Sequence, residues 1–318
     1  MSASAMGRSA FVFPGQGSQF VGMGLSLSEA HPGSREIFER ADRILGVKLS
    51  ELCFRGPEEA LRQTKNTQPA IFCHSIALLG AISGQPAMVA GHSLGEYSAL
   101  VAAGALPFED ALRLVRRRGE LMQEAGQELP GTMAAVVGLA PEIVEELCRE
   151  ASAQGAVQCA NFNSPGQIVI SGSVPGVRAA MELAKTRGAK LVKELVVSGA
   201  FHSSLMERAR DGLKSGLEAA PICDARIPIY ANVTGEPATR AAEIRELLFR
   251  QLTSPVRWEQ SVRNMVRDGA TRFTEVGPGK VLQGLIKRTD PKVALSGIDT
   301  WDDVIRHSKE GTAGDHAG

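Results

Sequence analysis

The sequence is poor in cysteine, and its cysteines form no pattern. The 318 residues include five cysteines, none in a CxxC pair: Cys53, Cys73, Cys148, Cys159 and Cys223. An odd, scattered set argues against a disulfide framework and favours free thiols in a reducing compartment. Histidine, cysteine and acidic residues also lack the spacing of a metal site, so we expect no bound metal.

The sequence has no excess of charge and no long hydrophobic run. Lysine plus arginine number 35, and aspartate plus glutamate number 35, which favours neither nucleic acid nor an anionic membrane as a partner. No segment approaches the roughly 18 to 20 apolar residues of a membrane span. Residues 1–9 carry one arginine and precede no apolar stretch of signal-peptide length. We therefore expect a cytoplasmic protein that binds neither nucleic acid nor a membrane.

The apolar residues that are present suffice for a sizeable core. Hydrophobic residues make up 43% and charged residues 22% of the chain, a balance typical of a globular protein. Short apolar runs typical of buried strands lie at residues 10–13, 87–90 and 272–276. Helical patterns lie at residues 68–82, 94–103, 109–126 and 280–288. Strands that alternate with helices predict an α/β fold with a parallel sheet.

The middle of the chain has a different order of predicted strands and helices. Strand-like and helical patterns follow one another at residues 132–138, 141–154, 157–162, 167–171, 175–187 and 190–197. This β-α-β-β-α-β order is that of the ferredoxin-like unit. We therefore expect a small domain at residues 131–198, inserted into a discontinuous larger domain of residues 1–130 and 199–306. Residues 307–318 are polar and rich in glycine and alanine, so we expect a flexible tail there.

The strongest chemical motif is Gly91-His92-Ser93-Leu94-Gly95. It fits G-x-S-x-G, with a predicted strand before it and a predicted helix after it, which is the context of a nucleophile elbow. The flanking glycines allow a strained turn that exposes the Ser93 hydroxyl, and the following helix offers free N–H groups to an oxyanion. The alternative interpretation is a Gly-Ser turn without function.

A serine nucleophile needs a base, and the chain has six histidines. His202 follows a predicted strand and precedes a helical pattern at residues 205–219, so it lies at a junction like that of Ser93. It could equally be a polar helix cap. We expect the His92 side chain to diverge from the neighbouring serine, and His74 to be a core histidine within a buried helix.

The helical pattern at residues 109–126 contains one arginine on its apolar stripe. The stripe comprises Ala111, Leu114, Val115, Arg118, Leu121, Met122 and Ala125. Arg113, Arg116 and Arg117 fall on the opposite face, where solvent is expected. A buried arginine without a partner is costly, so Arg118 either pairs with a carboxylate of the protein or binds an anionic ligand.

Six motifs appear in the order in which one enzyme family has them. They are Phe13-Pro14-Gly15-Gln16-Gly17-Ser18-Gln19, Gly91-His92-Ser93-Leu94-Gly95-Glu96-Tyr97-Ser98, Arg117-Arg118-Gly119, Asn161-Phe162-Asn163-Ser164-Pro165-Gly166-Gln167, Gly199-Ala200-Phe201-His202-Ser203 and Glu275-Val276-Gly277-Pro278-Gly279. Across residues 10–300 the chain resembles malonyl-CoA:acyl carrier protein transacylases, including the free-standing acyltransferases of polyketide synthases. The resemblance implies an α/β-hydrolase-like domain with an inserted ferredoxin-like domain.

The resemblance also implies catalytic roles. Ser93 would be the nucleophile and His202 its base. The backbone carbonyl of Gln251 would orient the histidine ring in place of an acid. Backbone N–H groups of Gln16 and Leu94 would form the oxyanion hole.

The resemblance further implies the substrates. Malonyl-CoA would be the donor and the phosphopantetheine thiol of an acyl carrier protein the acceptor, with no cofactor bound by the chain itself. Arg118 would hold the free carboxylate of the malonyl group. Ala200 and Phe201 would belong to the acyl-binding site, because Ala200-Phe201-His202 is the version seen in malonyl-selective polyketide acyltransferases. Phe201 would fill the space near C2 of the acyl group. Fatty acid and polyketide biosynthesis are both open as the pathway.

Two rival functions fit parts of the sequence. A serine thioesterase or acyl hydrolase shares the elbow and usually has its histidine late in the chain, which would make His307 the base and leave Arg118 without a role. A non-catalytic module that binds carrier proteins would have a decayed site. The presence of Ser93, Arg118, His202 and Gln251 together argues against decay.

Overall fold

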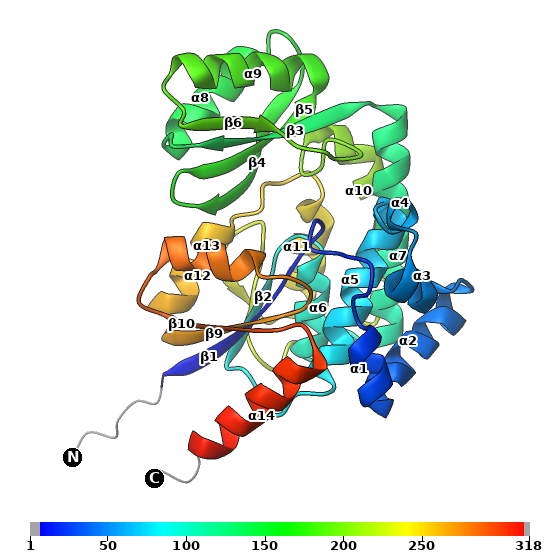
Figure 1. Ribbon diagram of the computed structural model, residues 1–318. Coiled ribbons are helices and arrows are strands. Elements are labelled where there is room, and N and C mark those ends of the chain that lie inside the picture. Colours follow the sequence, from blue (N-terminus) through cyan, green and yellow to red (C-terminus); the bar gives the residue numbers. More distant parts are fainter. Residues whose placement is uncertain (1–6, 315–318) are drawn as a thin grey trace, which may run out of the picture.

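The molecule has two layers, each a sheet with its covering helices, and the larger one is built on a mostly parallel sheet (Figure 1). The computed structural model describes residues 7–314, in which six strands pair in the order β10-β9-β1-β2-β7-β8. Their bounds are Arg8–Phe13 (β1), Met88–Gly91 (β2), Ile229–Tyr230 (β7), Pro237–Ala238 (β8), Ala270–Val276 (β9) and Ala294–Ile298 (β10). Every pair is parallel except β7 with β8. The predicted α/β class is confirmed.

Helices cover both faces of this sheet, which explains why its strands read as apolar runs rather than as alternating patterns. Along β1, Phe11 and Phe13 belong to one hydrophobic core and Ala10 and Val12 to another. The first core includes α6 (Gly95–Ala102), and the second includes α12 (Trp258–Arg267) and α13 (Val281–Thr289). Strands β1 and β2 thus lie between two hydrophobic cores.

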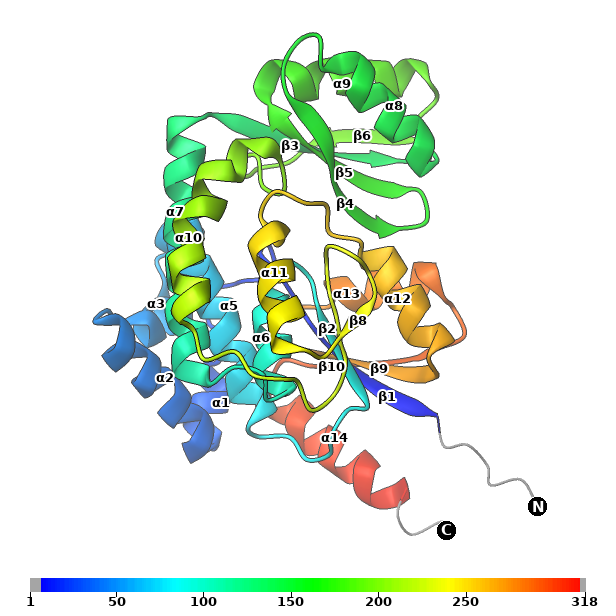
Figure 2. The same ribbon diagram turned by 180° about the vertical axis from the view of Figure 1, so that it is seen from behind.

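The first core extends through a group of helices beside the sheet (Figures 1 and 2). Their bounds are Leu25–Ala30 (α1), Pro32–Leu45 (α2), Leu49–Arg55 (α3), Glu58–Leu61 (α4), Thr64–Leu79 (α5), Phe108–Glu128 (α7), Ser204–Met206 (η1), Glu207–Ala219 (α10) and Ala241–Gln251 (α11). Helices α5 and α7 approach closely at Gly119, where an added Cβ would lie 2.9 Å from the Thr64 carbonyl oxygen. None of the described helices combines the length and the apolar character needed to cross a membrane.

The smaller layer is an antiparallel sheet in the order β4-β5-β3-β6. Its elements are Gly131–Val137 (β3), Pro141–Ala151 (α8), Val157–Ser164 (β4), Gln167–Ser173 (β5), Val174–Thr186 (α9) and Leu191–Glu194 (β6). Helices α8 and α9 cover one face and share a separate core with the strands (Figure 2). This element and strand order is that of a ferredoxin-like unit, and it lies within the segment expected to be inserted.

Strand β4 ties the smaller sheet to the rest of the molecule. The Phe162 N–H donates to the Val256 carbonyl at 2.9 Å, and the Val256 N–H donates to the Ala160 carbonyl at 2.8 Å. Val256 lies just before α12, so β4 continues by hydrogen bonds into the larger layer. These bonds hold β4, one side of the cavity described below, against the larger layer.

The end of the chain differs from the expected tail. Helix α14 spans Trp301–Gly314, so the tail predicted to begin at residue 307 is helical as far as Gly314, and residues 315–318 lie outside the described part. Asp303 caps this helix by accepting from the N–H groups of Asp299 and Thr300. Val304 is buried and the His307 ring packs edge-on against Phe11. The composition of residues 307–318 does not predict these contacts, which hold the helix against the rest of the molecule.

Candidate active site

Ser93 occupies a sharp turn between β2 and α6. Its φ is +50°, in the left-handed region that non-glycine residues rarely adopt. A Cβ added to Gly91 would lie 1.9 Å from the Gly95 carbonyl carbon, and one added to Gly95 would lie 2.1 Å from the Phe13 carbonyl oxygen. Both glycines of the motif are therefore required by close backbone approach, as the elbow hypothesis demands.

Asn232 supports this turn from the loop after β7. Its Oδ1 accepts from the Ser93 N–H at 2.7 Å, and its Nδ2 donates to the Gly91 carbonyl at 2.7 Å. The buried amide thus pairs with two backbone groups on either side of the strained turn. Sequence reasoning missed Asn232, because a single asparagine after a short apolar run has no distinctive pattern.

Ser93 and His202 meet although 109 residues separate them in the sequence. The Ser93 hydroxyl donates to His202 Nε2 at 2.7 Å, and His202 Nδ1 donates to the Gln251 carbonyl at 3.0 Å. A carbonyl can only accept, so the Nδ1 proton is fixed and Nε2 is left free to accept from the serine. Among residues 7–314, Ser93 and His202 are the two non-glycine residues with positive φ.

The surroundings of His202 keep its ring neutral. Burial is the largest cause and the Arg118 charge the next, and together they lower the pKa of His202 to about 3. A neutral imidazole at physiological pH is the form that can take a proton from serine.

Arg118 lies on the buried face of α7, as the stripe predicted. On the opposite face Arg113 and Arg117 are exposed, whereas Arg116 is half-buried and donates to the Lys65 carbonyl. Its Nη1 donates to Gln68 Oε1 at 2.8 Å. Its Nη2 donates to Gln251 Oε1 at 2.9 Å and to Ser93 Oγ at 3.0 Å. Within the described residues, no carboxylate lies at ion-pair distance from the guanidinium, and Nε has no hydrogen-bond partner. Neutral groups hydrogen-bond the buried cation, and the Tyr97 ring centroid lies 5.7 Å from its guanidinium carbon.

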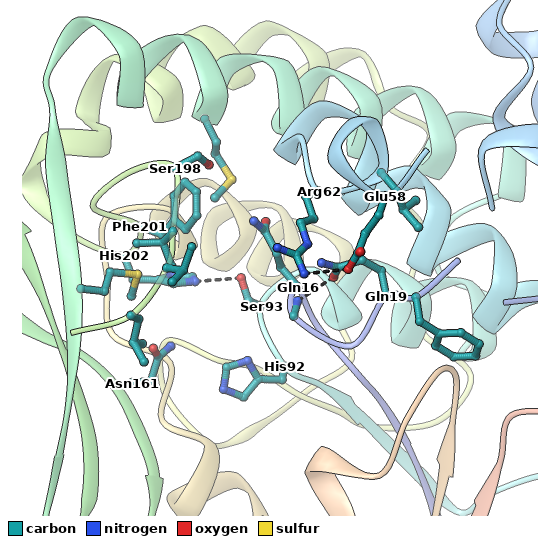
Figure 3. Close-up of a pocket in the computed structure, with 18 residues that line it drawn as sticks. Gln16, Gln19, Glu58, Arg62, His92, Ser93, Asn161, Ser198, Phe201 and His202 are labelled. Atoms are coloured by element: carbon teal, nitrogen blue, oxygen red, sulfur yellow. Dashed lines mark hydrogen bonds and ion pairs between the residues drawn. The ribbon is translucent and has the colours of Figure 1, made fainter. Parts of the chain in front are cut away.

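Ser93 opens into a cavity of about 740 Å³ between the two layers (Figure 3). The lining residues are Gln16, Gly17, Gln19, Phe20, Glu58, Leu61, Arg62, His92, Ser93, Met122, Met133, Asn161, Leu195, Val196, Val197, Ser198, Phe201 and His202. The cavity can therefore admit a long thioester to the serine. Of the predicted site residues, Ser93, His202, Gln16 and Phe201 line it. Arg118, Ala200, Leu94 and Gln251 are buried and do not line it.

Two backbone N–H groups near Ser93 are available to an oxyanion. Leu94 stands at the N-terminus of α6, and Gln16 lies in the loop after β1. A Cβ on Gly15 would lie 2.4 Å from the His92 carbonyl oxygen, so this loop is pressed against the elbow. Within the part of the chain that is described, neither the Gln16 nor the Leu94 N–H donates to a protein acceptor.

Three other histidines within residues 7–314 make their contacts elsewhere. His92 Nε2 lies 2.9 Å from Asn163 Oδ1, so its side chain diverges from Ser93 as expected. His74 is fully buried, with Nε2 2.9 Å from Asp299 Oδ1. His307 packs on Phe11 and does not line the cavity. The hydrolase order that required His307 as the base is therefore wrong for this chain.

Comparisons with known proteins agree with this arrangement. The acyl transferase domain family model matches residues 10–298. The malonyl CoA-acyl carrier protein transacylase of Bacillus subtilis is 48% identical over 96% of this chain and 98% of its own length. The corresponding protein of Staphylococcus aureus is 42% identical over 94% of this chain and 98% of its own.

Solved structures agree as well. A malonyl-transacylase in complex with its type II PKS acyl carrier protein has a TM-score of 0.92 and 40% identity, covering 95% of this chain and 99% of its own. The malonyl CoA-acyl carrier protein transacylase of Coxiella burnetii has a TM-score of 0.91 and 39% identity, covering 96% and 99%. Since these similarities span nearly the whole chain, it belongs to the malonyl-CoA:acyl carrier protein transacylase family of acyl transferases.

Proposed function

We propose that this chain moves a malonyl group from malonyl-CoA to the phosphopantetheine thiol of an acyl carrier protein, through an ester on Ser93. One observation carries the proposal. The Ser93 hydroxyl oxygen lies within hydrogen-bond distance of both His202 Nε2 and Arg118 Nη2. A nucleophile, its base and a cation suited to a carboxylate therefore converge on one atom.

In the first half-reaction, Ser93 Oγ attacks the thioester carbonyl while His202 Nε2 takes its proton. The N–H groups of Gln16 and Leu94 stabilise the charge on the tetrahedral oxyanion. The carbon–sulfur bond breaks, and the proton on His202 passes to the departing thiolate of coenzyme A. The Gln251 carbonyl holds the ring so that Nε2 faces the serine throughout.

In the second half-reaction, the carrier-protein thiol replaces coenzyme A. His202 takes the thiol proton, the sulfur attacks the Ser93 ester, and the proton returns to Ser93 Oγ as the ester bond breaks. The reaction is thus a ping-pong exchange between two thiols. Apolar side chains around the serine, Met122, Met133 and Phe201, restrict the access of water to the ester in the meantime.

Arg118 supplies selectivity for a dicarboxylic acyl group in this proposal. A guanidinium can bind a carboxylate with two parallel hydrogen bonds. No carboxylate of the described residues lies at ion-pair distance from the guanidinium, which supports an anionic substrate over a direct structural ion pair. Phe201 stands at the cavity wall, where its ring would exclude a branch at C2 of the acyl group.

The free thiols support a reducing compartment such as the cytoplasm for this reaction. All five cysteines are unpaired, and four of them are buried. Thiols in that state are typical of proteins that fold without disulfides.

The covalent intermediate is the direct test. Incubation with malonyl-CoA should add one malonyl group, at Ser93, and a holo carrier protein should then remove it. Ser93→Ala should abolish the adduct. Ser98→Ala is the matched control, because Ser98 is a buried serine on α6 of the same motif and should leave the adduct intact. An adduct that persists in Ser93→Ala, or that forms but passes only to water, would reject the proposal.

A further inference from the structure

Glu96 is a buried carboxylate one helical turn from the nucleophile, and the mechanism above does not use it. It is 3% exposed and lies in the first turn of α6. Its Oε2 accepts from Gln251 Nε2 at 2.6 Å and from the Asn232 N–H at 3.4 Å. In the described part of the chain, no cation lies at ion-pair distance from this carboxylate. A buried anion in this position requires another source of charge balance.

The Gln251 amide connects Glu96 to Arg118. Its Nε2 donates to Glu96 Oε2 and, at 2.9 Å, to the Ser93 carbonyl, while its Oε1 accepts from Arg118 Nη2 at 2.9 Å. Both Nε2 partners can only accept while Glu96 is ionised, so the amide must turn its oxygen towards the arginine. The Gln251 side-chain amide thus bridges the buried Arg118 cation and the buried Glu96 anion.

We infer that Glu96 is the internal counter-charge of Arg118 in the empty site and takes up a proton when the malonyl carboxylate reaches Arg118. The inference rests on the proposed function, which brings a carboxylate to this guanidinium. With an ionised Glu96, the occupied site would hold two anions and one cation in a buried setting, and protonation of Glu96 restores neutrality. Glu96 touches no reacting atom and acts through Gln251, so it is a positioning residue.

The titration of the site supports this exchange. Burial raises the pKa of Glu96 to about 7, although the hydrogen bonds from Gln251 and Asn232 and the Arg118 charge act in the opposite direction. A malonyl carboxylate on Arg118 cancels the influence of that cation, so it raises the pKa of Glu96 further.

The other titratable groups that face Glu96 do not change charge in the same range. They are Arg118 from α7 and Tyr97 from α6, with His202 beyond the arginine. Burial raises the pKa of Tyr97 to about 12, and that of His202 is lowered to about 3. A change in malonyl recognition around neutral pH therefore points to Glu96.

The test compares malonyl-CoA with acetyl-CoA across pH. Both carry the same coenzyme A phosphates, so the ratio of their kcat/KM values cancels titration of the donor. For a shift of one pKa unit, the ratio in the wild-type enzyme should fall roughly 5- to 10-fold between about pH 6 and about pH 8.5. Glu96→Gln keeps an oxygen that can accept from Gln251 but cannot titrate, so its ratio should stay level.

Glu275→Gln is the matched control for this comparison. Burial also raises the pKa of Glu275 to about 7. Its carboxylate accepts from the Leu282 and Gln283 N–H groups at the start of α13, and it forms no hydrogen bond with Arg118 or Gln251. Glu275→Gln should therefore retain the wild-type slope.

A second measurement needs no variant of Glu96. With a pH indicator in weak buffer near pH 7.5, formation of the malonyl adduct on the wild-type enzyme should take up more protons than formation of the acetyl adduct. Equal uptake, a level wild-type ratio, or the same slope in Glu96→Gln would each overturn the inference. Should one of these results be found while Arg118→Ala still lowers the ratio of kcat/KM for malonyl-CoA over acetyl-CoA, the proposed function stands and only the role of Glu96 fails.

Discussion

The low pKa of His202 makes a specific prediction about activity in acid. An ordinary histidine base, with a pKa near 6.5, would be only about 3% neutral at pH 5 and would lose roughly 25-fold in rate from pH 7. With a pKa of about 3, His202 should remain almost entirely neutral at pH 5. We therefore expect the second-order rate constant for acylation by malonyl-CoA to fall less than about twofold over that interval.

The same pKa shift affects stability with a defined sign. The fold holds His202 neutral, whereas the unfolded chain binds a proton below pH 6.5, so this contribution to stability is lost as the pH falls from 6.5 towards 3. At pH 5 the loss amounts to about 2 kcal/mol. His202→Ala should abolish this contribution, so its free energy of unfolding should be less sensitive to acid than that of the wild-type enzyme.

Rapid-quench mass spectrometry of the malonyl adduct, with circular dichroism at each pH, measures both effects. A rate that falls about 25-fold with an apparent pKa near 6.5 would refute the environment assigned to His202. The variant gives an independent check, because loss of a general base costs roughly 10²- to 10⁴-fold in rate. If His202→Ala retained wild-type acylation, the base would have to be another residue.

Three further predictions follow from the site. Phe201→Ser should improve methylmalonyl-CoA use relative to malonyl-CoA by roughly 10- to 200-fold in the ratio of kcat/KM values, and an unchanged ratio would remove Phe201 from the account of selectivity. Asn232→Ala should lower the free energy of unfolding by about 2 kcal/mol and slow acylation, because it strips the Ser93 N–H and the Gly91 carbonyl of their partner. Gly91→Ala should cost about 3 kcal/mol or more in a denaturant titration, because its Cβ would lie 1.9 Å from backbone, and wild-type stability would contradict the tight elbow.

Some parts of the site could be predicted because local patterns specify them. The turn at Ser93 requires glycines at fixed offsets, since its backbone passes within contact distance of β1 and α6. The inward register of Arg118 follows from the helical period of its neighbours. Both features depend on residues close in sequence, so both were visible without a structure.

Other parts could not be predicted from local patterns. His202 alone could equally be a helix cap, and only its position beside Ser93, 109 residues earlier, separates the two interpretations. Gln68 and Glu96 are ordinary polar residues within helices, and nothing in their spacing indicates that they surround Arg118. Polar networks assembled from distant elements leave no periodic pattern in the sequence.

The central claim is that Arg118 receives the malonyl carboxylate, and the ratio of kcat/KM for malonyl-CoA over acetyl-CoA tests it most directly. Removal of one partner of a buried charge pair costs about 3 to 5 kcal/mol, so Arg118→Ala should lower this ratio by roughly 160- to 5,000-fold. Arg118→Lys keeps the charge without the planar fork and should fall between. Acetyl transfer should stay level or rise. If Arg118→Ala instead leaves the ratio unchanged while the melting temperature and both activities fall together, Arg118 is a structural residue and the account is wrong.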